Sequence, residues 1–198
     1  MPVKKTIHAA LAVAAFYAGI QLGPVARAEP DDWRAEASPE DARRLARIDQ
    51  AWSEGLRQAR QGGHRPDLAN LGLLVDRKAA LRESRPEPGA YYCRTVKLGS
   101  PGGRGPAFAA YEWFRCEVEE GPGGELLLEK ITGSQRPWGR LYEDGARRLV
   151  YVGGQAGYGH DPAHDQIGAF ERLGEDHYRL VLPWSKQASV LDLIELRR

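Results

Sequence analysis

"KITGSQRPWGRLYEDGARRLVYVGG", residues 130–154, carries the clearest fold signal in this chain. Two runs of aromatic and aliphatic residues, 136–143 and 147–154, flank an Asp-Gly pair at 144–145. An Asp-Gly pair between such runs is typical of the tight turn of a β-hairpin. The same residues could instead form an anion-binding or catalytic loop, so the neighbouring sequence has to distinguish the two interpretations.

The sequence on both sides of this stretch repeats the strand pattern. Short apolar runs separated by Gly, Pro and Asp turn signals predict eight strands, at 90–98, 109–119, 125–132, 136–143, 147–154, 167–174, 176–184 and 189–197. Eight short strands joined by sequential hairpins favour an up-and-down antiparallel barrel or a sandwich. The quoted stretch is therefore predicted to supply two of these strands.

The N-terminal part has helical periodicity instead. Ser38 and Pro39 are typical of an N-cap and a first helical position, and apolar residues follow at helical spacing until Gly62. A second helix is predicted from about Pro66 to Leu81. We therefore expect an α+β protein, in which an N-terminal pair of helices packs on an antiparallel, roughly eight-stranded β-barrel-like or lipocalin-like meander.

Residues 1–28 are predicted to be a signal peptide. Two lysines precede an apolar run from Ala9 to Ile20, and an A-x-A pattern ends at Ala28. Because a bilayer-spanning helix needs about 20 apolar residues, we expect no stable membrane span after cleavage, although an uncleaved anchor is the alternative. No cysteine lies near the cleavage point, which argues against a lipid-modified N-terminus.

This assignment divides the chain into three parts and places it outside the cytoplasm. The parts are the signal peptide at 1–28, a polar lead-in and two-helix segment at 29–89, and an antiparallel β domain at 90–198. The expected location is periplasmic or secreted. We expect a monomer.

The charge balance argues against a nucleic-acid partner. The full chain has 28 basic and 27 acidic residues, and removal of the signal peptide leaves 25 and 27. Proteins that hold nucleic acid through a strong field need an excess of basic residues, so no nucleic acid is expected as a partner.

The only two cysteines are Cys93 and Cys116. In an oxidising compartment, two cysteines favour a disulfide. If the first two predicted strands form a hairpin with its turn near Gly103 and Arg104, the two cysteines lie directly opposite one another. A metal-binding or catalytic thiol pair is the alternative, but no histidine lies within a few residues of either cysteine.

Together, several segments resemble one known family. "PGAYYCRTVKLG", "YEWFRCEVEE", the quoted stretch, "GAFERLGEDHYRLVLPW" and "SVLDLIELR" are similar to the bacterial exported-protein family of unknown function named domain of unknown function (DUF) 4893. The most specific part is T-G-S-Q-R followed by G-x-L-Y. The resemblance covers nearly all of the mature chain, implies an exported protein of about this size, and carries no activity or catalytic residues with it.

A looser analogy is with small exported barrels. Periplasmic metalloprotease inhibitors and lipocalin-like ligand carriers share the strand number, and the inhibitors share an early disulfide. This analogy concerns architecture alone, and architecture does not determine function.

The candidate ligand-binding residues are polar or aromatic and come from the quoted stretch: Ser134, Gln135, Arg136, Trp138 and Arg140. They could form the rim of a barrel mouth, and a barrel of eight strands can hold one small ligand or be filled by its own side chains. Alternatively, the arginines point outward and form exposed ion pairs, which contribute only about 0–1 kcal/mol.

The segment 157–166 offers a weaker candidate for metal binding. His160 and His164 would share one face of a helix and could ligate zinc, but Pro162 and neighbouring glycines favour a solvated loop. Ser134 with His160 or His177 could be written as a hydrolase triad, yet the G-x-S-x-G context is missing. No cofactor is expected.

We therefore expect a non-enzymatic binding module of the cell envelope, whose partner is a small amphipathic ligand or an envelope protein. The alternatives are a periplasmic protease-inhibitor-like protein that acts through residues 29–37, and a hydrolase or metal-dependent enzyme that uses the 157–166 loop.

Overall fold

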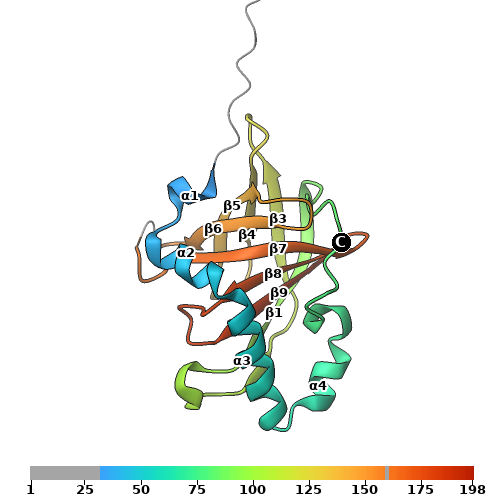
Figure 1. Cartoon of the computed structure of the whole chain (residues 1–198). Coiled ribbons are helices and arrows are strands. Elements are labelled where there is room, and N and C mark those ends of the chain that lie inside the picture. Colours follow the sequence, from blue (N-terminus) through green and yellow to red (C-terminus); the bar gives the residue numbers. More distant parts are fainter. Residues whose placement is uncertain (1–31, 159–160) are drawn as a thin grey trace, which may run out of the picture.

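A computed structural model describes residues 32–158 and 161–198 (Figure 1). The predicted signal peptide lies outside these residues. The strands are β1 (Gly89–Leu98), β2 (Phe108–Ala110), β3 (Phe114–Glu120), β4 (Leu126–Lys130), β5 (Pro137–Glu143), β6 (Leu149–Gln155), β7 (Gln166–Gly174), β8 (His177–Pro183) and β9 (Leu191–Arg197). The helices are α1 (Trp33–Glu36), α2 (Pro39–Ala46), α3 (Ile48–Gln61) and α4 (Arg65–Asn70), with 3-10 turns η1 (Gly72–Val75) and η2 (Pro101–Gly103).

Eight of the strands form a closed antiparallel barrel. β1 and β3 to β9 pair in sequence order, and β9 pairs back with β1 from Leu191↔Leu98 to Arg197↔Tyr92. The quoted stretch forms β5 and β6, with the turn between Glu143 and Leu149. The predicted α+β barrel is confirmed, and closure removes the free strand edges that an open sheet would have.

The second predicted strand, 109–119, is wrong in one detail: it is split into β2 and β3. Both pair with the same edge of β1, β2 with Val96–Leu98 and β3 with Gly89–Cys93. The residues between them, Tyr111 to Trp113, are one more than the ladder needs, which is the arrangement of a bulge.

The disulfide between Cys93 and Cys116 is present, but the expected register is wrong. Cys93 lies opposite Phe114, and Cys116 lies opposite Tyr91, so the bridge runs diagonally with a Cα–Cα distance of 5.8 Å. The chain between Cys93 and Cys116 contains the 3-10 turn η2 and the bulge between β2 and β3. The pairing is therefore not centred on residues 103–104, as the predicted hairpin assumed. A shift of two residues keeps Cys116 on the same face of β3, which is why the bridge still forms.

The helical segment differs more from expectation. The first predicted helix is bent at Arg47, so α2 contacts β7 and β8 while α3 contacts β1, β8 and β9. The second predicted helix, 66–81, ends at Asn70, because Gly72 has a φ of +53°. Part of the polar lead-in is also helical: α1 is capped by the Asp32 side chain and buries Trp33 against β6.

The core has two layers, one inside the barrel and one under the helices. Inward-facing side chains such as Leu126, Tyr151, Phe170 and Leu180 are fully buried and fill the barrel. Outward-facing residues of β1, β7, β8 and β9 pack under α3, which crosses the barrel with α2 (Figure 1). No helix in the described ranges is both long and apolar enough to span a membrane.

Candidate functional site

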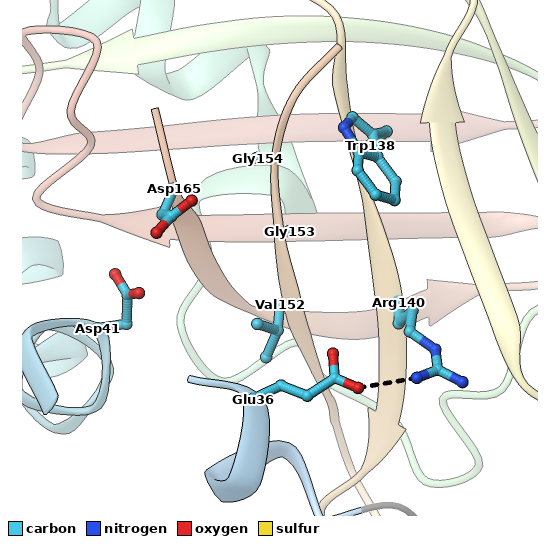
Figure 2. A pocket seen from close by; sticks show the side chains of 8 residues that line it. All are labelled: Glu36, Asp41, Trp138, Arg140, Val152, Gly153, Gly154 and Asp165. Atoms are coloured by element: carbon cyan, nitrogen blue, oxygen red, sulfur yellow. Dashed lines mark hydrogen bonds and ion pairs between the residues drawn. The ribbon is translucent and has the colours of Figure 1, made fainter. Parts of the chain in front are cut away.

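A cleft of about 420 Å³ lies on the outer face of the barrel, between the first two helices and strands β5 to β7 (Figure 2). Its barrel wall is formed by the outward-facing side chains of Trp138, Arg140 and Val152. Its opposite side carries carboxylates from α1, from α2 and from the residue before β7. The cleft therefore combines an aromatic ring with charged groups.

The floor of the cleft is bare backbone. β6 pairs with β5 as far as Gln155, but its pairing with β7 ends at Gly153↔Gln166. The two strands separate beyond this pair, and Gly153 and Gly154 line the gap without side chains. Figure 2 shows Asp165 on one side of this glycine pair and Trp138 on the other.

Two of the three carboxylates are already paired. Glu36 Oε1 accepts a hydrogen bond from Arg140 Nη1 at 2.8 Å. Asp41 pairs with Arg44 in a buried contact and also accepts a hydrogen bond from the Ser38 hydroxyl. Burial raises the pKa of Asp41, but the Ser38 and Arg44 contacts outweigh burial and hold this pKa below its usual value.

Asp165 differs from these two. Its backbone carbonyl accepts a hydrogen bond from Arg44 Nη2 at 3.0 Å, which fixes the position of the residue. Its carboxylate has no hydrogen bond or ion pair with any residue of 32–158 or 161–198. Among the described residues, the Asp165 carboxylate therefore has no charge partner, and it lies across the glycine floor from Trp138.

Of the five predicted ligand-binding residues, the structure brings two into the cleft. Trp138 and Arg140 line it, whereas Ser134, Gln135 and Arg136 lie exposed on the loop between β4 and β5. That loop sits at the end of the barrel where β4 ends and β5 begins, so it forms part of a rim. Whether any of the five binds a ligand stays a prediction.

Sequence reasoning missed the acidic side of the cleft. Glu36 lies in the predicted polar lead-in, and Asp41 lies near the start of the first predicted helix. Asp165 belonged to a loop considered for its histidines. Their convergence depends on how α1 and α2 pack on the barrel, and no sequence spacing reports that packing.

The weaker candidates do not form a cluster. His164 Nδ1 lies 3.0 Å from Asp161 Oδ2 and its ring stacks on Tyr158 at 3.8 Å, while His160 lies outside the described residues. Within the described ranges, no group of three or more His, Cys, Asp or Glu residues could hold a metal ion. Ser134 and His177 lie at opposite ends of the barrel. Ser134 follows the end of β4, whereas His177 is the first residue of β8, which begins at the barrel end where β4 also begins.

The chain was also compared with known proteins. No curated protein and no solved structure matches it. A family model described as "Domain of unknown function (DUF4893)" matches residues 33–196, which cover the four helices and all of the barrel except the last residue of β9. The chain therefore belongs to the family described as Domain of unknown function (DUF4893).

Proposed function

We propose that the protein is a non-enzymatic binding module of the cell envelope, and that the outer cleft holds a small amphipathic ligand with a cationic group. The observation that carries this proposal is the half-exposed Trp138 ring, which lies across a bare glycine floor from the unpaired Asp165 carboxylate. An aromatic face attracts a cation through its quadrupole, and a carboxylate supplies the opposite charge.

The barrel interior is a less suitable place for an amphipathic ligand. A lipocalin-like carrier needs an open lumen, but the middle of this barrel is occupied by its own side chains, including Leu126, Tyr151 and Phe170. Protein interiors packed in this way leave few voids larger than a water molecule. The proposal therefore uses the outer face, where a hollow of about 420 Å³ exists. That volume lies in the usual range for small-molecule sites.

Calorimetric titration with benzyltrimethylammonium, a quaternary ammonium ion that carries a phenyl ring, tests the proposal. We expect saturable binding that weakens by about tenfold in Trp138→Ala and in Asp165→Asn, because each change removes one of the two attractive groups. Trp113→Ala is the matched control: Trp113 is also exposed, and Arg94 lies over its ring, but it is not in the cleft.

Absence of saturable binding, or equal affinity in wild type, Trp138→Ala and Asp165→Asn, would overturn the proposal. If the probe does bind, mass spectrometry of the compounds that co-purify with the protein would identify the natural ligand class. A protein that co-purifies in fixed stoichiometry, and is released by Trp138→Ala, would instead assign the cleft to an envelope protein partner.

The protease-inhibitor alternative receives less support. It requires residues 29–37 to reach into a protease, but Trp33 is buried and its indole N–H donates to Asp144 Oδ1 at 3.3 Å. The loop-enzyme alternative would need a catalytic group near His164, whose described partners are Asp161 and Tyr158.

A further inference from the structure

One end of the barrel interior is polar. Because successive side chains of a strand point to opposite faces, the inward positions can be followed along each strand from the apolar core outward. Leu126 and Leu128 lead to Lys130 on β4, and Tyr91 and Cys93 lead to Lys97 on β1. The same alternation places Gln166 at the start of β7 and Asp192 at the start of β9 on the inner face. These are the strand ends next to the exposed 131–136 loop.

The positive charge of this layer is only partly compensated. Lys97 Nζ donates to the Gln187 carbonyl at 3.1 Å and lies 3.7 Å from Asp192 Oδ2. Lys130 is 5% exposed, and its Nζ lies 3.9 Å from the centre of the Phe114 ring. It has no hydrogen bond or ion pair with any described residue. Burial, and then the charge of Lys97, lower the pKa of Lys130.

Two further groups in the layer lack partners. Gln166 is 1% exposed, and neither its side-chain oxygen nor its nitrogen has a hydrogen-bond partner among the described residues. The hydroxyl of Tyr151 is fully buried and likewise has none. Buried polar groups without partners are rare in folded proteins, so Gln166 and Tyr151 stand out as inner-face residues with unused hydrogen-bonding capacity among the described residues.

The glycines of β5 and β6 bring these groups into one layer. Gly139 and Gly153 lie opposite each other, and the Tyr151 ring covers both: a Cβ would come within 2.7 Å of the ring at Gly139 and within 2.8 Å of the hydroxyl at Gly153. Gly153 is in turn the direct pairing partner of Gln166. The Tyr151 hydroxyl is thereby directed toward the level of Gln166, at the polar end of the barrel.

The exposed 131–136 loop lies next to Lys130. Gly133 lies over this lysine, and a Cβ at Gly133 would be 3.2 Å from Lys130 Nζ. Gly133 is itself exposed and has a φ of +89°, so the loop presents no side chain at the point nearest the ammonium group. Gln187, whose carbonyl accepts from Lys97, also donates a hydrogen bond of 2.8 Å from its side chain to Gln155 Oε1 on β6.

We propose that this polar end of the barrel is a binding site for a small oxyanion, held by the Lys130 ammonium with the Gln166 amide and the Tyr151 hydroxyl as further donors. Each of these groups can donate a hydrogen bond, and bonds from a charged donor to an oxyanion are among the stronger ones in proteins. Carboxylates and phosphates share this chemistry. This site does not use Trp138 or Asp165, the two groups that would hold the ligand of the outer cleft.

The test is calorimetric titration of the purified protein with sodium phosphate and, separately, with sodium acetate, at constant ionic strength and near-neutral pH. We expect saturable binding of at least one anion, and a rise in the melting temperature with its concentration. Lys130→Met keeps the length of the side chain and removes the charge, so affinity should fall by about tenfold or more. Lys78→Met, a change at an exposed lysine of the helical segment, should leave affinity unchanged.

The pattern of results separates the possibilities. Binding of phosphate alone assigns an inorganic or organic phosphate, binding of acetate alone assigns an organic carboxylate, and both support a general oxyanion site. Gln166→Leu is the second variant, and the affinity for the anion should fall in this variant too. The test therefore still works if Lys130→Met fails to fold. No saturable binding of either anion would overturn the proposal. So would affinities that are equal in wild type, in Gln166→Leu and in a folded Lys130→Met.

Discussion

The two ends of the barrel differ in what their inward-facing side chains do. At the end where β1 and β8 begin, Tyr91 meets Tyr178 edge-on at 6.0 Å and Tyr178 stacks on Phe170 at 5.4 Å. At the other end, the inner face carries Lys97, Lys130 and Gln166, and the Gln166 amide has no partner among the described residues. The inward-facing positions thus hold packed aromatic rings at one end of the barrel and charged or polar side chains at the other. Stability should depend on the first end, and binding on the second.

The largest expected effect is at the apolar end. Phe170 is fully buried and lies against Tyr178. Phe170→Ala should lower the free energy of unfolding by about 3–5 kcal/mol, since it removes a large buried ring and leaves a cavity. Urea unfolding followed by circular dichroism measures this loss. A loss below about 1 kcal/mol would show that this end is not the stabilising one.

The disulfide gives the next effect. The bridge joins β1 and β3 on the inner face and closes a sequence separation of 23 residues. Replacing both Cys93 and Cys116 with alanine should cost about 2–4 kcal/mol, because the unfolded chain regains freedom. Urea unfolding of this variant, with wild type under reducing conditions as the control, checks the value. A stability equal to that of oxidised wild type would contradict it.

At the polar end, stability should depend on pH through Asp192. Burial raises the pKa of this carboxyl, against the weaker opposing effects of Lys97 and Ser189. The folded protein therefore holds the proton more tightly than the unfolded chain. The resulting stabilisation is complete below the ordinary pKa of about 4 and is lost as pH rises through the raised pKa.

Asp192→Asn removes this titration. The free energy of unfolding of wild type, relative to the variant, should fall by up to about 1.4 kcal/mol per pH unit above pH 4 until the folded pKa is passed. Urea unfolding of both proteins at a series of pH values measures the difference. A difference that rises with pH, or stays constant, would refute the prediction.

The smallest expected effect on stability is at Gln166. Gln166→Leu replaces a buried amide that has no partner among the described residues with an apolar side chain that is one atom shorter, so the free energy of unfolding should stay unchanged or rise by about 1 kcal/mol. Thermal unfolding without added anion measures it. A clear loss of stability would show that the amide has partners, and would weaken the contrast between the two ends.

The barrel could be predicted from the sequence because each strand has a recognisable local sequence pattern. Alternating apolar residues and the Asp144-Gly145 turn identify β5 and β6 without any tertiary information. The boundaries of the helical segment could not be predicted, because they depend on long-range contacts. Arg179 is the clearest case. It faces outward on β8 but is completely buried under η1, where its guanidinium donates to the carbonyls of Leu73, Leu74 and Asp76.

The candidate sites were predictable only in part, for a related reason. Trp138 and Arg140 lie on one strand of the quoted stretch, so their shared face follows from the period of two. The carboxylates opposite them come from segments more than 90 residues before and more than 20 residues after that strand. Unpartnered groups such as Gln166 can be recognised only once all of their neighbours are known.

Closure of the barrel between β1 and β9 also sets the order in which the protein can fold. The pairing joins Tyr92 to Arg197, which follows it by 105 residues in the sequence. While the chain is being synthesised, β1 has no partner on that edge until the last strand has been made. Unpaired strand edges invite association with other chains. The free edge of β1 must therefore stay protected until β9 has been made. Meanwhile the disulfide can already secure the other edge of β1, because Cys116 follows only 23 residues after Cys93.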